Sequence, residues 1–195
     1  NNFGFIQIDI INAPFWYVLP RIIVFFFLFT VGMSLSLAHK TKINWRSFNR
    51  RFFKIAFFAA IISIVTYFIF PDNWIYFGTL QTKDIISFIS LPFLKRPNLS
   101  LIIALALFIP SVFLDKNIPW ISLAHQSWDY ISPFPWLGAS LLGIFAVHKK
   151  LHRLQIPDNN IVKSLNFLGK NSLLIYLIHQ PILFGTVYLF HAIKT

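Results

Sequence analysis

The sequence contains no cysteine and no glutamate, and charged residues make up only 12% of its 195 residues. Soluble domains carry about 25% charged residues, so the chain has too little charge for a typical water-soluble globule. The absence of cysteine excludes disulfide frameworks and thiolate metal sites. Hydrophobic residues make up 56% of the chain, and 24 residues are phenylalanine. This composition excludes a disordered chain, a coiled coil and a collagen-like fibre, and it predicts a membrane domain with several spans.

Six long apolar stretches are the candidate membrane spans. A helix needs about 20 residues to cross a hydrocarbon core of about 30 Å, and lipid does not tolerate open sheet edges. We therefore predict an all-α, polytopic membrane helix bundle with about six spans. The fourth and fifth stretches are short, so these helices need flanking residues or a locally thinner bilayer. The stretches cover residues 15–38, 52–70, 76–94, 99–114, 134–148 and 172–191.

The basic residues have two interpretations. Lys and Arg total 17 and the net charge is +11, which in a soluble protein is typical of nucleic-acid binding. Thirteen of them fall within residues 40–54, 95–96 and 149–170, and three lie on the opposite side of the predicted membrane. This alternation follows the positive-inside rule, so we expect these loops to be cytoplasmic and expect no nucleic-acid partner.

The last apolar stretch carries a polar stripe. Ser172, Tyr176 and His179 lie at positions i, i+4 and i+7, so a helix places them on one face, with Gln180 beside Tyr176. An ionisable residue inside the membrane indicates function by default, although His179 also fits a packing role in which it hydrogen-bonds a neighbouring helix. Pro181 follows directly and frees a backbone carbonyl near the imidazole.

Two further polar pairs lie in the third stretch and before the fifth. Gln81 and Asp84 are three residues apart and share a helical face. They fit either a substrate contact or an Asp84 that is neutralised locally by Lys83, with the lysine reaching outward. Asp129 and Tyr130 lie together before the fifth stretch. Asp129 fits two roles: a hydrogen bond to a sugar hydroxyl or to a cationic histidine, or an interaction with the N-terminus of the helix. The preceding external segment, residues 115–133, is longer than a turn requires and is expected to cover a site.

The remaining polar and small residues carry weaker signals. No motif for a zinc protease, a nucleotide triphosphate, an esterase or a dinucleotide is present, and we expect no metal. Small residues four apart predict close helix packing at Gly32 and Ser36 and at Ala139 and Gly143. Histidines beside basic loops are expected to be solvated, namely His39, His148 and His152, whereas His125 is a weak candidate on the opposite side.

Four blocks of this sequence resemble a known family. Residues 27–37, 77–81, 129–143 and 168–181 occur in the order seen in the catalytic domain of heparan-α-glucosaminide N-acetyltransferase and its bacterial relatives, within the transmembrane acyltransferase superfamily. The similarity covers nearly the whole chain. The last block is the most specific, because a polar Leu-Ile-His-Gln-Pro run inside a membrane helix is rare.

The resemblance implies acyl transfer across a membrane, here a bacterial cytoplasmic membrane. A cytoplasmic acyl-CoA, with acetyl-CoA as co-substrate, would modify a hydroxyl or amine, often on a sugar, on the far side. Family members usually open with a helix bearing an Asp-x-x-Arg-Gly type motif, followed by an extracytoplasmic histidine. This chain begins after that helix, so residues 1–195 are expected to form a partial domain. After Gln81 the family tends to be apolar, whereas this chain has Thr82, Lys83 and Asp84.

These observations lead to a set of expected roles. The predicted catalytic residues are His179, Gln180 and Asp129. The predicted acceptor-binding residues are Tyr130, Gln81, Asp84, Tyr176, Ser172 and Trp136. The residues expected to meet CoA phosphates, unless they only signal topology, are Lys170, Arg50 and Arg51. Two alternatives stay open: a transporter or channel-like protein with a polar path through His179, Asp84 and Lys83, and a non-catalytic membrane scaffold.

Overall fold

A computed structural model describes residues 14–39, 43–114, 118–123, 125, 127, 129–153, 160–171, 174, 175, 178, 182 and 186. Within these residues all regular structure is helical, which confirms the predicted all-α class. The helices are α1 (Pro14–Ala38), α2 (Trp45–Ile69), α3 (Thr79–Ser90), η1 (Leu91–Phe93), α4 (Pro97–Phe113), α5 (Pro133–His148), η2 (Leu151–Arg153) and α6 (Asn160–Lys170). The chain divides into two units, one of residues 18–152 and one of residues 1–17 and 153–195.

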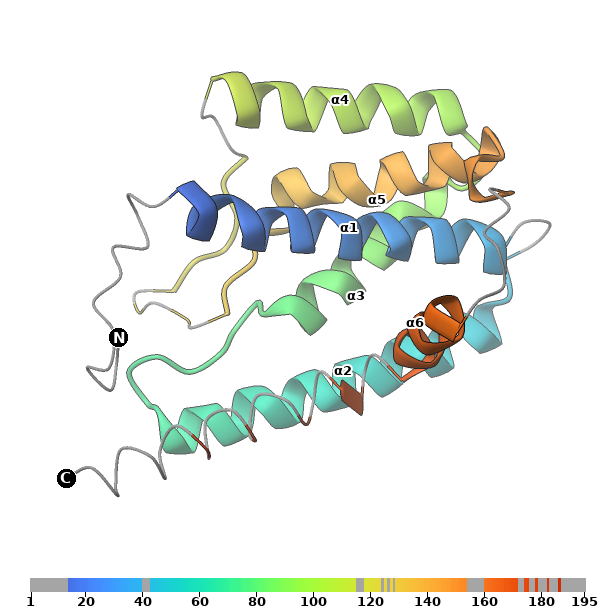
Figure 1. The fold of residues 1–195 in the computed structure, drawn as a ribbon. Coiled ribbons are helices and arrows are strands. Elements are labelled where there is room, and N and C mark those ends of the chain that lie inside the picture. Colours follow the sequence, from blue (N-terminus) through green and yellow to red (C-terminus); the bar gives the residue numbers. More distant parts are fainter. Residues whose placement is uncertain are drawn as a thin grey trace. The chain divides into compact units, whose positions relative to one another are not determined.

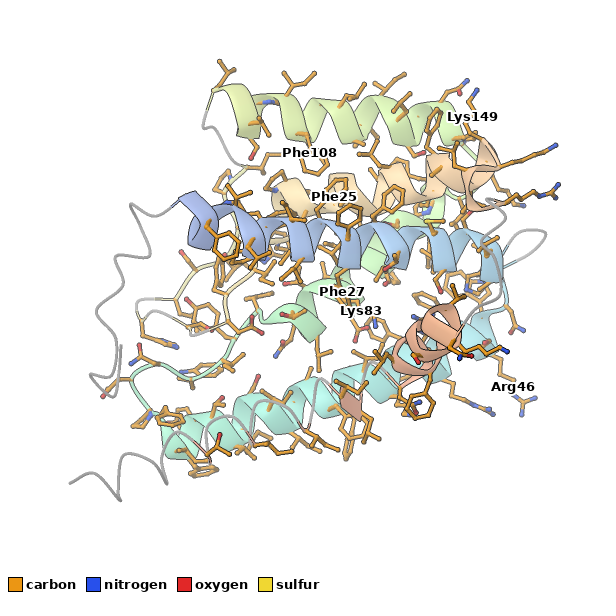
Figure 2. All side chains as sticks on the ribbon, viewed as in Figure 1. Phe25, Phe27, Arg46, Lys83, Phe108 and Lys149 are labelled. Atoms are coloured by element: carbon orange, nitrogen blue, oxygen red, sulfur yellow. The ribbon has the colours of Figure 1, made fainter. Side chains whose placement is uncertain are left out.

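In the unit of residues 18–152, the long helices alternate in direction (Figure 1). The end of α1, the start of α2, the start of α4 and the end of α5 lie at one end of this unit, on the right of the view. Figure 2 shows the side chains of Arg46 and Lys149 at that same end. We call it the basic end, and we call the other the opposite end.

Helix α5 forms the centre of this unit, and α1 packs against it almost backbone to backbone. A Cβ added to Gly32 of α1 would lie 1.8 Å from the carbonyl oxygen of Ser140, and one added to Gly143 of α5 would lie 2.1 Å from that of Phe29. Ser36 and Ala139 are both buried. The predicted packing role of these small residues is therefore confirmed, because only small side chains leave room for so close a contact.

Two further contacts hold α4 and α3 to the same centre. A Cβ on Gly138 of α5 would lie 2.8 Å from the ring of Phe108, so glycine admits this α4 side chain. Phe108 also packs against Phe25 of α1, with ring centroids 5.9 Å apart (Figure 2). The hydroxyls of Ser90 in α3 and Ser140 in α5 lie 3.1 Å apart and are fully buried. This hydrogen bond joins two helices where no water can replace it.

The lengths of the helices differ in part from the predicted spans. Two helical segments, Val18–Ala38 and Trp45–Ile69, are long and apolar enough to cross a membrane, whereas Pro97–Val112 and Pro133–His148 are apolar but shorter. The third predicted span, residues 76–94, is wrong as a continuous helix, because α3 has only 12 residues and a 3₁₀ turn follows. Pro92 lacks the backbone N–H that would continue the α-helical pattern. The predicted linker 149–170 contains helix α6, which sequence reasoning missed.

Candidate functional site

The first polar site lies at the start of α3, where a side chain from a distant loop meets the helix N-terminus. The carboxylate of Asp129 accepts hydrogen bonds from the backbone N–H of Thr79 at 3.1 Å and from the Thr79 hydroxyl at 3.0 and 3.1 Å. A Cβ on Gly78 would lie 3.0 Å from an Asp129 oxygen, so glycine lets the carboxylate approach. A negative charge at this position satisfies free N–H groups and stabilises the helix dipole.

The chain before α5 folds over the same helix start. The backbone N–H of Ile131 donates to the carbonyl of Phe77 at 2.9 Å, and the buried Thr82 hydroxyl donates to the carbonyl of Ile131. The Tyr130 hydroxyl donates to the carbonyl of Ile121 at 3.1 Å. Burial and the neighbouring Tyr76 raise the pKa of Tyr130 above its usual value. These contacts hold the segment before α5 against the N-terminal end of α3.

An aromatic cluster adjoins this segment. The Tyr76 hydroxyl donates to the carbonyl of His125 at 2.9 Å and accepts from the N–H of Leu123 at 3.2 Å. The His125 ring stacks on Trp74 at 5.2 Å between centroids and meets the edge of Tyr76 at 4.8 Å. Within the described residues, the Nε2 atom of His125 and the Nε1 atom of Trp120 are buried and have no hydrogen-bond partner. A buried polar atom without a partner is costly, so these two nitrogens are candidates for ligand contacts.

The second polar site is a cavity of about 50 Å³ between α1, α2 and α3, towards the basic end. Its apolar wall comes mainly from α1 and α2. Its polar lining consists of His39, Ser47, Arg51, Lys83, Asp84 and Ser87. Within the described residues, the Oδ2 atom of Asp84 is buried and has no hydrogen-bond partner.

Cationic groups surround this carboxylate. The Lys83 ammonium lies 5.5 Å from the centroid of the Phe27 ring of α1, so it points into the bundle instead of outward (Figure 2). Arg51 donates to the Ser34 hydroxyl at 3.4 Å. Lys83 and Arg51 both act electrostatically on Asp84. The cavity therefore brings one arginine, one lysine and one aspartate side chain together.

His39 closes the cavity at the end of α1, and the expectation that it is solvated is wrong. Its side chain is buried, and its Nδ1 atom accepts the backbone N–H of Asn44 at 3.2 Å. Only a neutral imidazole can accept this hydrogen bond. Burial and the nearby Arg51 lower the pKa of His39 below its usual value. His148, by contrast, is exposed as expected.

The structure separates Gln81 and Asp84, which the sequence placed on one face. The Gln81 amide donates to the Ser63 hydroxyl of α2 at 2.9 Å and to the carbonyl of Ala59 at 3.5 Å, while Asp84 lines the cavity. Gln81 thereby ties α3 to α2. Trp136 packs against the hydrophobic core of α5 and its neighbours.

The residues predicted at the basic end and in the last apolar stretch differ in what the structure shows of them. Arg50 and Arg51 are both exposed, but only Arg51 is among the residues that line the cavity. Four predicted residues lie outside the described residues, and the Lys170 side chain is not described either; the four are Ser172, Tyr176, His179 and Gln180. The roles predicted for all of these residues stay predictions.

Sequence reasoning missed the roles of Thr79 and His39. Thr79 follows a glycine at the start of a helical pattern, which is a local signal for a helix start, but its partner Asp129 is 50 residues away. The burial of His39 has no local signal, because it depends on contacts with Asn44 and with the ring of Phe48 in α2. Within the described part of the chain, no group of three or more His, Cys, Asp or Glu residues could hold a metal ion.

Comparison with known proteins identifies one family. The model of the family described as heparan-alpha-glucosaminide N-acetyltransferase, catalytic, matches residues 1–181 of the chain. The resemblance inferred from the sequence motifs is thereby confirmed. Searches of curated proteins and of solved structures return no match.

Proposed function

The chain belongs to the family of the heparan-alpha-glucosaminide N-acetyltransferase catalytic domain, and from this premise we propose that it is a multi-pass membrane acetyltransferase. Its donor is acetyl-CoA, bound from the basic end on the cytoplasmic side. Its acceptor is an amine or hydroxyl, on a sugar, presented at the opposite end. The observation that carries the proposal is the family match, which extends over residues 1–181.

The exposed apolar surface of α2 supports a membrane location. Phe53, Phe57 and Phe68 are 67%, 63% and 78% exposed, although they lie on a helix long enough to span a bilayer. Water-soluble monomers rarely leave a large contiguous apolar surface of this kind in contact with water. Lipid tails would cover these rings. The basic end is then cytoplasmic, as the positive-inside rule requires.

The two polar sites support the assignment of donor and acceptor sides. Asp129 contacts the start of α3 from the segment before α5. The same segment carries the buried nitrogens of Trp120 and His125, which have no hydrogen-bond partner among the described residues. These groups offer hydrogen bonds to an acceptor, together with Tyr130. The cavity that contains Arg51 lies towards the basic end, where the donor would bind. Arg50 and Lys170 stay predicted contacts for the CoA phosphates.

The proposed reaction is a direct acyl transfer. The acceptor nitrogen or oxygen attacks the thioester carbonyl carbon, the C–S bond breaks, and an amide or ester bond forms. A base takes the acceptor proton, and the CoA thiolate takes up a proton as it leaves. We assign the base to His179 together with Gln180, and acceptor binding to Ser172, Tyr176 and Trp136. Histidine is the side chain most often used as a general base, because imidazole can both accept and donate a proton.

Acetyl transfer by the purified protein tests this function. We expect release of CoA from acetyl-CoA that depends on an added amino sugar, together with acetylated product. A general base contributes about 10²–10⁴-fold, so His179→Ala should lower turnover by that factor without lowering expression. His148→Ala is the matched control, because His148 is exposed and lies at the end of α5.

The outcomes separate the alternatives. A transporter would bind or move solutes without releasing CoA, and a non-catalytic scaffold would not bind acetyl-CoA. An active protein in which His179→Ala turns over at the wild-type rate would remove His179 from the mechanism while leaving the function intact.

A further inference from the structure

The cavity between α1, α2 and α3 contains an incomplete set of polar contacts. The Oδ2 atom of Asp84 is buried there without a partner among the described residues, although a carboxylate oxygen accepts hydrogen bonds strongly. Ser34 accepts from Arg51 at 3.4 Å, a long hydrogen bond. Lys83 has a ring contact with Phe27 and, among the residues that the structure describes, no ion pair. A ligand that fills the cavity must therefore donate one hydrogen bond and accept several.

The net charge of the cavity selects an anion. The cavity has two basic side chains, Arg51 and Lys83, against one acidic side chain, Asp84, and His39 is neutral because its Nδ1 atom accepts the Asn44 N–H. The basic side chains are therefore in excess. The complementary ligand is an anion that can also form a hydrogen bond with the Asp84 carboxyl group.

The size of the cavity limits the ligand to a small group. A single water requires a cavity of about 10–15 Å³, and this cavity measures about 50 Å³. It therefore has room for a tetrahedral oxyanion. Sulfate and ionised carboxylates lack a donor for Asp84. A phosphate monoester has a second pKa near 6, so it still carries a P–OH proton part of the time at neutral pH.

We propose that this cavity binds a phosphate monoester, with Arg51 and Lys83 contacting the phosphate oxygens and Asp84 accepting the P–OH proton in a hydrogen bond. The assignment rests on the proposed function when it names the source, which is the 3′-phosphate of the CoA donor. A lipid phosphate monoester has the same chemistry and is the competing source.

Donor analogues test the site on the intact protein in vesicles. We compare acetyl-CoA with acetyl-3′-dephospho-CoA, which lacks only the phosphate monoester. Hydrogen bonds to charged groups are worth about ten- to hundredfold in binding, so the KM for the dephospho donor should be higher by about that factor. Lys83→Met and Arg51→Met should raise the KM for acetyl-CoA and abolish the preference. Lys54→Met is the matched control, because Lys54 is exposed on α2 outside the cavity.

Equilibrium binding of adenosine 3′,5′-bisphosphate provides a readout that needs no turnover. Wild type and Lys54→Met should bind it and release it to inorganic phosphate but not to sulfate, and Lys83→Met and Arg51→Met should bind it at least about tenfold more weakly. The Arg51 variant keeps the test informative if the Lys83 variant fails to fold, because Arg51 lies on the exposed side of α2.

The results separate this inference from the proposed function. Equal use of both donors by the wild type, or a preference that survives both substitutions, overturns the phosphate site while acetyl transfer stands. If no donor supports transfer, the proposed function fails, and bisphosphate binding that depends on Lys83 and Arg51 still supports a phosphate site. Displacement of the bisphosphate by vesicles containing phosphatidic acid, with equal use of both donors, overturns the assignment to CoA.

Discussion

Replacing Gly32 by alanine should separate α1 from α5. The new Cβ would lie 1.8 Å from the carbonyl oxygen of Ser140, and ordinary contacts of this kind begin at 3.4 Å. The backbone of α1 fixes the position of this Cβ, and the carbonyl oxygen belongs to the backbone of α5, so the helices must move apart by roughly 1.5 Å or one of them must bend. Overpacking of this kind costs about 1–3 kcal/mol. The gain of about 0.5–1 kcal/mol from replacing a helical glycine by alanine offsets only part of it.

Gly169→Ala is the matched control, because it is the same substitution in a helix without a steric conflict. A Cβ at Gly169 of α6 meets no atom within 4 Å. The control should leave stability unchanged or raise it slightly, by about 0.5–1 kcal/mol. The two variants therefore differ in the sign of their effect, not only in its size.

Thermal unfolding in detergent measures this difference. For a chain of about 200 residues, each kcal/mol shifts Tm by about 2–4 °C, so a net loss of about 2 kcal/mol lowers Tm by about 4–8 °C. Gly143→Ala should behave like Gly32→Ala, because its Cβ would lie 2.1 Å from the carbonyl oxygen of Phe29. A Gly32→Ala variant as stable as Gly169→Ala would refute the close packing of α1 on α5.

Three other predictions concern polar contacts. Burial and a neighbouring arginine lower the pKa of His39. As the pH falls, the unfolded chain therefore takes up a proton near pH 6.5 while the folded protein does not. The free energy of unfolding should fall from pH 7 to pH 5, and His39→Gln should flatten the corresponding fall in Tm. Ser90→Ala and Ser140→Ala should each lower the free energy of unfolding by about 0.6–2 kcal/mol, because each leaves a buried hydroxyl unpaired. In a double-mutant cycle, the double variant should lose less than the sum of the two single losses. Strictly additive losses would contradict the hydrogen bond between the two serines. Asp129→Ala should lower the free energy of unfolding by about 1–2 kcal/mol, because it removes the hydrogen bonds to Thr79 at the start of α3. Asp129→Asn should retain part of this stabilisation through its amide oxygen. An unchanged Tm in Asp129→Ala would show that the carboxylate does not cap α3.

The sequence predicted the features that depend on composition and local spacing. The apolar stretches predicted α1, α2, α4 and α5, because apolar runs of this length in a chain with little charge are typical of helices. Glycine and serine spacing predicted the contact of α1 with α5, since close packing requires small residues at one helical face. The predicted length of α3 was too great, because the apolar sequence continues past Pro92, which lacks the N–H needed for the α-helical hydrogen bonds.

The candidate sites were less accessible to sequence reasoning, because their contacts are not local. Asp129 was placed near a helix N-terminus, but the helix it caps is α3 and not the one that follows it. Gln81 and Asp84 share a helical face by spacing, yet one contacts α2 and the other lines a cavity. Lys83 was expected to reach outward, whereas the ring of Phe27 gives its ammonium a contact inside the bundle.

The central claim, that an acetyl group passes from one side of a membrane to the other, is tested most directly in sealed proteoliposomes. Radiolabelled acetyl-CoA is placed on the side that the basic end faces, and glucosamine is placed on the other side. We expect labelled N-acetylglucosamine in the acceptor compartment and free CoA in the donor compartment. Label that stays on CoA when an intact bilayer separates the two substrates, or transfer that occurs only when both share one side, would contradict it.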